Sequence, residues 1–262
     1  MSPPIPKPTI FLRNKFFIKP GLQGHFFVGQ RDLLINTRPV LDTDLKLDLI
    51  AACGKTPLIQ GESAPEPLPP MMHIWQLRGW DSLYQAMYDF SETDWYTAEV
   101  QSLLSEHQDL LVGAGQGIEM SARPAQWYAP DAPGYMYVYE EIVLNMNTSK
   151  LSHLRQLNWF VEQVKDDRCY LQWVGGGITG RPGQICLLWR APSREVIEKT
   201  LCKMAYEAPN AERYAQMMLG VQSISREYLY PESTEHIDNE LSKAPQNKAR
   251  IAAHKGGVKH NG

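Results

Sequence analysis

The chain has 262 residues, of which 43% are hydrophobic and 21% charged, and its formal net charge is -3 at pH 7. This composition is typical of ordinary globular proteins, and it excludes the disordered and fibrous classes. The charge balance lacks the excess of Lys and Arg with which nucleic-acid-binding proteins displace counterions from phosphate. We therefore expect a folded protein that has no nucleic acid as its main partner.

The cysteines and the apolar runs exclude further classes. The four cysteines form no CxxC or other metal-ligand spacing, which predicts reduced core residues and no bound metal; they are Cys53, Cys169, Cys186 and Cys202. No run approaches the ~18 uninterrupted apolar residues of a membrane span. The Pro-rich N-terminus has neither the apolar stretch of a signal peptide nor the Arg-rich pattern of a transit peptide. We expect a cytoplasmic protein without a membrane span.

The first half of the chain alternates strand-like and helix-like segments. Strands are predicted over three β-rich runs closed by turn signals: 9–18, 47–53 and 71–79. Helices are predicted over 22–40, from a capping box formed by Ser82 and Gln85, and from Ser91 past Leu104. A fourth strand is predicted over 116–122, before a Pro-rich linker over 122–134. The order is therefore β-α-β-β-α-β.

The second half repeats this order. Strands are predicted over 135–144, 169–174 and 184–190, and helices after the caps Thr148 and Ser193. The segment "GGGITGRPG" lies between two strands, which favours a hairpin turn over a phosphate-binding loop. Two copies of one split βαβ unit, whose sheets face each other, explain this repetition. The polar segment after Pro231 is expected to be a tail.

Three segments resemble the NIPSNAP protein family. "MHIWQLRGWDSLYQAM" is similar to the family motif of an apolar strand followed by a helix, "GQICLLWRAPS" to its second copy, and "IKPG" to the turn after the first strand. The resemblance covers about residues 9–228 and implies tandem ferredoxin-like repeats that form an intramolecular dimeric α+β barrel. The implied divisions are 1–125 for the first repeat, 134–228 for the second and 229–262 for the C-terminal tail.

The chain also departs from the family pattern. Where the second repeat of the family usually reads Tyr-Glu-Leu-Arg, this chain has Tyr137, Val138, Tyr139 and Glu140. Members are described both as enzymes of small-molecule metabolism and as interaction proteins, so the resemblance implies no single function. Some families of this fold superclass bind haem through a histidine, and His73 is the matching candidate here.

The strand over 135–141 carries the main candidate site. Its side chains alternate, so Tyr135, Tyr137, Tyr139 and Glu141 share one face, and we expect this face to line the barrel. A carboxylate in an apolar cavity can act as a general base, and phenols can donate hydrogen bonds to a developing enolate. The alternative is a structural one, in which the tyrosines are core aromatics and Glu141 pairs with Arg13 or Arg190.

Other residues complete the predicted site. The predicted catalytic residues are Glu141 as base, Tyr137 and Tyr139 as donors, and His73 and Arg78 as polar partners. The predicted substrate-binding residues are Trp75, Trp173, Trp189, Tyr135 and Arg190. The sequence leaves open which face of the strand that carries His73 and Trp75 looks inward.

Two classes of function follow. The first is a cofactor-independent enzyme of metabolic or biosynthetic type, an isomerase, lyase, cyclase or oxygenase, which transfers protons on a bulky apolar small molecule bound inside the barrel. The alternative is a non-catalytic binding or scaffold protein of the NIPSNAP type, and a minor alternative is a haem-binding protein. We expect a hydrophobic small-molecule ligand and a homodimer.

Overall fold

The computed structural model describes residues 10–22, 26, 47–54, 70–77, 103–113, 135–163, 169–177 and 183–231, with the backbone alone for 47–50, 52 and 103–113. The strands in this part are β1 (Ile10–Ile18), β2 (Leu47–Gly54), β3 (Met71–Leu77), β4 (Leu103–Gly113), β5 (Met136–Leu144), β6 (Tyr170–Gly177), β7 (Gln184–Ala191) and β8 (Val221–Pro231). The helices are α5 (Lys150–Gln163), α6 (Arg194–Tyr206) and α7 (Asn210–Met218).

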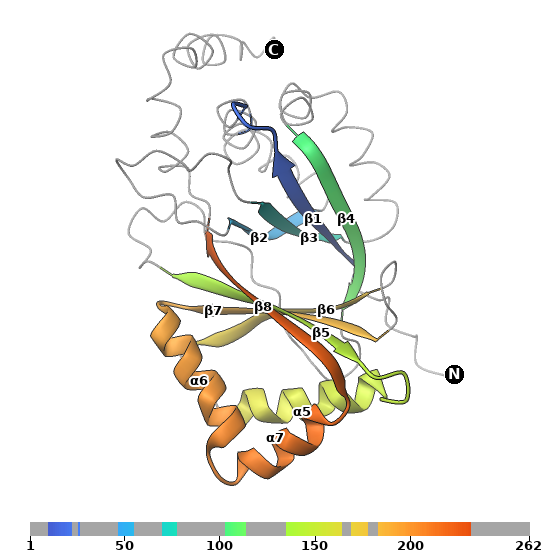
Figure 1. The fold of residues 1–262 in the computed structure, drawn as a ribbon, viewed down its shortest axis with the longest axis vertical. Coiled ribbons are helices and arrows are strands. Elements are labelled where there is room, and N and C mark those ends of the chain that lie inside the picture. The colour runs from blue at the N-terminus through green and yellow to red at the C-terminus, as the bar shows by residue number, and fades with distance from the viewer. Residues whose placement is uncertain are drawn as a thin grey trace, which may run out of the picture.

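The strands close into one antiparallel barrel in the order β1-β3-β2-β8-β5-β7-β6-β4 (Figure 1). Each half of the chain contributes four neighbouring strands, in the orders β4-β1-β3-β2 and β8-β5-β7-β6. The two halves therefore arrange their strands alike. Within the described residues, the seams between them consist of the pairs Cys53↔Pro231 and Gly54↔Tyr230 of β2 and β8, and of the pairing of β4 with β6 between 111–113 and 175–177.

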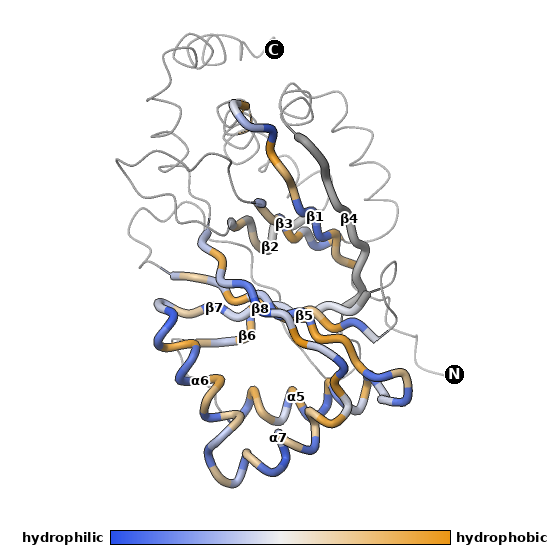
Figure 2. Tube along the Cα trace, in the orientation of Figure 1, coloured by the Kyte–Doolittle hydropathy of each residue, from blue (hydrophilic) through white to orange (hydrophobic). Residues whose placement is uncertain are grey.

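The helices of the second half cover the outside of its strands. In Figure 1, α5, α6 and α7 lie together on the side of β5–β8 that is turned away from β1–β4. Hydrophilic residues follow the outer side of α6 and α7 in Figure 2. The fold is thus α+β. The β-α-β-β-α-β order is described only after residue 135, because the helices expected over 22–40, from Ser82 and from Ser91 to residue 102 fall almost wholly outside the described residues.

Helix starts follow from capping residues. Ser193 caps α6, as predicted, because its side chain accepts a hydrogen bond from the Val196 amide at 3.4 Å. The prediction of Thr148 as the cap of α5 is wrong by one residue. The helix begins at Lys150, and the Ser149 hydroxyl accepts from the Ser152 amide at 3.3 Å.

The fourth strand of the first half is earlier than predicted. The expected helix past Leu104 is wrong, because β4 runs over Leu103–Gly113 and pairs with β1 and β6. The segment "LLSEHQDLLVG" has apolar residues at both ends and polar ones between, a seven-residue spacing that also suits a helix. Backbone pairing with β1 on one side and β6 on the other makes the segment a strand despite this helix-compatible pattern. Residues 116–122 lie outside the described part.

Two apolar cores separate the two faces of the sheet. The outer core joins the helices to the strands and includes Val138, Ile142, Leu187 and Trp189. The inner core lies within the barrel and joins both halves of the chain: Phe11, Ala51, Cys53, Met72, Ile74, Tyr137, Tyr139, Trp173, Cys186, Leu188 and Leu229. The alternation of β5 between these cores shows which face lines the barrel.

Candidate functional site

The predicted tyrosine face of β5 looks into the barrel. Tyr137 and Tyr139 belong to the inner core and Tyr135 packs against it. Glu141 follows at the same parity, and its side chain is 29% exposed. The expected inward orientation of this face is therefore confirmed, whereas the catalytic roles of its residues stay predictions.

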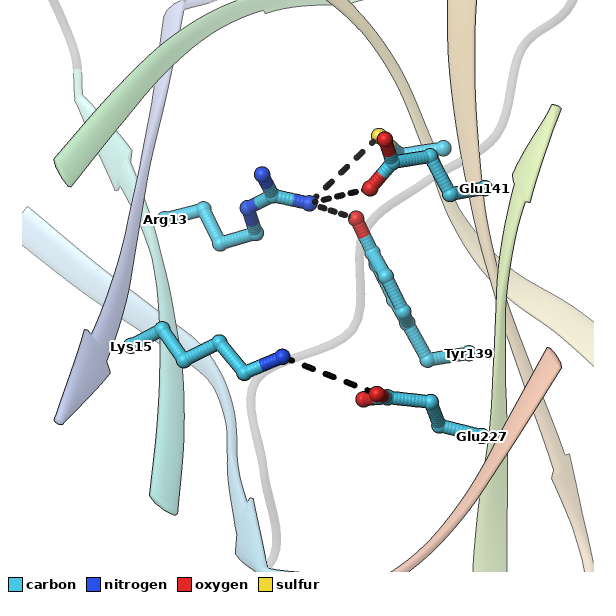
Figure 3. A network of polar contacts seen from close by, with 6 residues as sticks. Arg13, Lys15, Tyr139, Glu141 and Glu227 are labelled. Atoms are coloured by element: carbon cyan, nitrogen blue, oxygen red, sulfur yellow. Dashed lines mark hydrogen bonds and ion pairs between the residues drawn. The ribbon is translucent and has the colours of Figure 1, made fainter. Parts of the chain in front are cut away.

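One arginine reaches across the barrel to this face (Figure 3). β1 and β5 lie opposite each other, four places apart in the circle of eight strands. From β1, Arg13 Nη1 donates a hydrogen bond to Tyr139 Oη and lies 3.3 Å from Glu141 Oε2 and 3.9 Å from Cys186 Sγ. The side chain of Arg13 is only 12% exposed, so this ion pair has little solvent screening on the arginine side. The pairing of Glu141 with Arg13, weighed above as the structural alternative, is present.

A second ion pair lies beside the first. Lys15 of β1 approaches Glu227 of β8, with Nζ 3.6 Å from Oε1, and both side chains are partly exposed (Figure 3). These four side chains therefore place two positive and two negative charges close together inside the barrel. Charges so arranged can hold and orient a polar part of a ligand.

The phenols of this site stay protonated at neutral pH. Burial raises the pKa of Tyr137 and of Tyr139 well above the usual 10.0. The Tyr135 phenol adds to the rise at Tyr137, and the Cys186 thiol adds to it at Tyr139, where Arg13 opposes it. Both phenols can therefore donate hydrogen bonds. The Tyr139 oxygen accepts a hydrogen bond from Arg13, so the hydrogen of this hydroxyl points away from the guanidinium.

Arg190 lies on the inward face of β7 and stacks on tyrosines. Its guanidinium carbon is 3.7 Å from the centroid of the Tyr135 ring and 6.0 Å from that of Tyr170. It does not pair with Glu141 among the described residues, contrary to one of the two structural alternatives. Trp173 lies deeper in the inner core and packs edge-on against Phe11, with 5.5 Å between the ring centroids.

Two predicted site residues of β3 face away from the barrel. Ile74 and Met72 belong to the inner core, so His73 and Trp75 point to the other side of the sheet. There His73 packs against Phe16, at 4.8 Å between ring centroids, and against Trp75 at 6.2 Å. The proposed roles of His73 and Trp75 in the barrel are therefore wrong. Arg78 lies outside the described residues.

Trp189 is also on the outer face. It belongs to the core beneath the helices, and its Nε1 donates to Glu140 Oε2 at 2.7 Å. Glu140 accepts two more hydrogen bonds from Arg226, at 2.9 and 2.6 Å. The prediction of Trp189 as a wall of the ligand site is wrong, and the outward face expected for Glu140 is confirmed. This buried carboxylate links β5, β7 and β8 behind the barrel.

The described residues are suited neither to a metal ion nor, at His73, to a haem inside the barrel. There, no cluster of three or more His, Cys, Asp or Glu side chains is suited to a metal ion. Neither histidine with a described side chain faces into the barrel, because His73 lies behind β3 and His153 is buried on α5. His73 thus does not fit as a haem ligand inside the barrel. His107, expected on a helix, belongs to β4 and pairs in register with Lys15.

None of the four cysteines is in a disulfide, and Cys53, Cys169 and Cys186 are buried as expected. Cys202 is exposed, so its assignment to the core is wrong. No helix in the described ranges is long and apolar enough to cross a membrane.

Sequence reasoning missed Lys15, Glu227 and Cys186. Arg13 and Lys15 stand two apart within a strongly apolar strand, a spacing that places both on one face of the sheet. Two cations on one face of a buried strand indicate anionic partners across the barrel, so this signal was available. Nothing in the local pattern around Glu227 or Cys186 distinguishes them.

Comparison with known protein families found no match, and comparison with curated proteins found none either. Several solved structures are similar. A presumed monooxygenase from Lactobacillus acidophilus NCFM has a TM-score of 0.55 at 9% identity, over 87% of this chain and 98% of that chain. The encapsulated DyP-type peroxidase from Mycobacterium smegmatis has a TM-score of 0.52 at 13% identity, over 90% and 96%. A mutant chlorite dismutase from Candidatus Nitrospira defluvii has a TM-score of 0.53 at 8% identity, over 87% and 93%. Because the identities are this low, the likeness concerns the fold alone, and the chain shares the α+β barrel of these proteins.

Proposed function

We propose that this chain is an enzyme that transfers protons on a bulky, mostly apolar small molecule bound inside the barrel. The observation that carries the proposal is the contact of Arg13 with both Tyr139 and Glu141 across the barrel. It brings a carboxylate base, a phenol donor and a fixed cation together among apolar side chains. Such a set can remove a proton from carbon and stabilise the oxyanion that forms.

Each residue has a defined part in this scheme. The Glu141 carboxylate, 29% exposed, accepts the substrate proton. Arg13 holds that carboxylate in a fixed orientation, and its positive charge polarises the Tyr139 oxygen. Tyr139 donates its hydrogen to the developing enolate or phenolate oxygen, which it can do because burial keeps its pKa high. Return of the proton to another atom of the substrate completes an isomerisation.

The similar structures favour an oxidative outcome. Two of the three described above are named as a monooxygenase and a peroxidase. In a monooxygenation, the substrate carbanion reacts with molecular oxygen, one oxygen atom enters the product as a carbonyl and the other leaves as water. This balances with two substrate hydrogens and needs no further reductant. Proton removal by Glu141 is the first step of this reaction as well.

The proposal is tested with the full-length chain and a panel of polycyclic phenols and ketones under air. Substrate loss is followed by mass spectrometry and oxygen uptake with an electrode. Glu141→Gln should lower turnover by about 100-fold or more, and Tyr139→Phe by a smaller factor. Glu198→Gln, an exposed carboxylate on α6 outside the barrel, should have no effect. Unchanged turnover in Glu141→Gln would remove the base from the scheme.

The tandem repeats and the homodimer expected from the sequence are also proposals. The equal strand order of the two halves supports the idea that they are copies of one ferredoxin-like unit, as in the NIPSNAP proteins. A homodimer would be seen as a doubled mass in native mass spectrometry. A chain that binds no small molecule and turns none over would instead favour the scaffold alternative.

The haem alternative needs a ligand other than His73. The similarity to a DyP-type peroxidase and a chlorite dismutase is its support. If a haem were bound, it would supply redox chemistry at iron. An absorption spectrum of the purified chain after addition of haemin tests it, and an unchanged spectrum of free haemin would end it.

A further inference from the structure

Among the described residues, Arg190 is a cation on the inner face of the barrel that has no carboxylate beside it. Arg13 and Lys15 each approach a carboxylate, at 3.3 and 3.6 Å. Arg190 has no acidic partner and no hydrogen bond among the described residues, and its contacts are the rings of Tyr135 and Tyr170. A partly buried guanidinium without an anion is costly unless something else supplies the negative charge.

The stacking of Arg190 leaves its hydrogen-bond donors available. Its carbon lies 3.7 Å from the Tyr135 ring centroid, so the flat face of the guanidinium is covered. The five N–H groups lie in the plane of the guanidinium, and ring stacking does not use them. Stacking also fixes the orientation of the group. A planar carboxylate that approaches in the same plane can accept two of these hydrogen bonds.

Tyr137 adds a second donor at the same level of the barrel. The register places it directly opposite Arg190 on the neighbouring strand. It is 0% exposed, and its hydroxyl interacts with the neighbouring Tyr135 hydroxyl but makes no hydrogen bond of normal geometry among the described residues. Trp173 Nε1, in the same inner core, is likewise buried and unpaired there. Buried donors are nearly always satisfied, so these groups call for an acceptor.

We propose that Arg190, Tyr135 and Tyr137 form a binding site for the carboxylate of an apolar organic acid. This inference rests on the proposed function, because it takes the inside of the barrel as the ligand site and adds the class of substrate. Tyr137 and Glu141 are four residues apart on β5, or about 13 Å along the strand. The acid would therefore carry its carboxylate at one end and its reactive carbon about this far away, beside Glu141.

The test uses the full-length chain and two fluorescent probes of equal shape, pyrenebutyrate and the neutral pyrenebutanol. Affinities are measured by fluorescence titration. Wild type should bind the carboxylate about tenfold more tightly or better, which is the usual gain from charge-assisted hydrogen bonds. Arg190→Gln should abolish this preference without changing the affinity for pyrenebutanol. Tyr137→Phe should reduce it by a smaller factor.

Three controls define the outcome. Arg194→Gln removes an exposed arginine of α6 and should leave both affinities unchanged. Arg190→Lys keeps the charge but not the planar fork, and it should retain only part of the preference. Glu198→Gln removes an exposed carboxylate of α6, outside the barrel, and should also keep the preference. Far-ultraviolet circular dichroism verifies that each variant is folded.

Several results would overturn the inference. They are equal affinity of wild type for both probes, failure of both to bind, or a preference that survives in Arg190→Gln. Turnover that depends on Glu141 without a carboxylate preference overturns the carboxylate site and leaves the proposed function standing. A carboxylate preference together with turnover that Glu141→Gln does not affect overturns the proposed function and leaves the carboxylate site standing.

Discussion

Glu140 and Glu141 are adjacent in the sequence but serve opposite faces of β5. Glu141 points into the barrel and meets Arg13 across it. Glu140 points outward, where its carboxylate accepts hydrogen bonds from Trp189 and Arg226. Because strand side chains alternate, one step along the backbone separates a residue available to a ligand from one that only holds the fold together.

Loss of the Glu140 charge should therefore affect stability and spare the chemistry. Glu140→Gln removes the anion from a buried side chain and leaves Arg226 and Trp189 with weaker partners. We expect the free energy of unfolding to fall by about 1–3 kcal/mol in urea titrations, below the full cost of a buried pair because Arg226 is partly exposed. Glu198→Gln, which breaks an exposed pair with Arg194, is the matched control and should change stability little. An equal effect of both substitutions would contradict the assignment.

His153 should make stability depend on pH in the acid range. Burial on the inner side of α5 lowers its pKa below the usual 6.5. The unfolded chain then takes up a proton near that pH while the folded chain does not, so the free energy of unfolding falls as pH drops below about 6.5. The fall from this one residue is at most about 1.4 kcal/mol per pH unit. Urea titrations at several pH values should show a smaller fall in His153→Leu, and an unchanged pH profile would contradict the expectation.

At the scale of the element, the inward face of β6 shows how a strand makes room for a large ring. Gly175 follows Trp173 at the same parity, and a Cβ on Gly175 would lie 2.4 Å from Cζ2 of Trp173. The ring is 1% exposed and packs against Phe11, so it has little freedom to move. Glycine is required here because of this close approach.

The same contact gives a prediction for β6. Gly175→Ala should lower the free energy of unfolding by about 1–3 kcal/mol through overpacking. Adding Trp173→Phe, which removes the crowded part of the ring, should make the double variant more stable than the sum of the single effects predicts. Thermal or urea unfolding of the four proteins completes this cycle. Strict additivity would show that the alanine acts through the backbone instead.

At the scale of the whole molecule, the inner core is shared between the two halves. Phe11, Met72 and Ile74 come from the first half, and Tyr137, Trp173 and Leu188 from the second. Besides the backbone pairs of the two seams, this shared core and the contacts of Arg13 and Lys15 connect the halves in the described part of the chain. Neither half buries its inner face without the other.

Unfolding should therefore be a single cooperative event. Calorimetry should give one transition, with a calorimetric enthalpy equal to the van't Hoff enthalpy, although a chain of 262 residues is long enough for two independent domains. Circular dichroism and tryptophan fluorescence should report the same midpoint. Two resolved transitions would show that the halves are stable independently.

The segments that were predicted well are those with a local cause. Period-two alternation from Tyr135 to Glu141 placed the tyrosines and the carboxylate on one face, and the Ser193 side chain marked the start of α6. The β4 segment was mistaken for a helix because its apolar spacing suits both structures. Its pairing with β1 and β6 depends on residues far away in the sequence, and no local pattern contains that information.

Periodicity and capping act over a few residues, so they are readable in the amino-acid sequence. They predicted the β-rich runs of both halves, the α+β fold class and the shared face of β5. Closure of the barrel sets which face of β3 and of β7 looks inward. Both faces of these strands are buried along nearly their whole length, so the alternation of apolar and polar residues does not distinguish the inward face. For this reason His73, Trp75 and Trp189 were predicted as site residues although they lie on the outer face. The contacts of Arg13 with Tyr139 and Glu141 exist only once the barrel closes and brings β1 opposite β5.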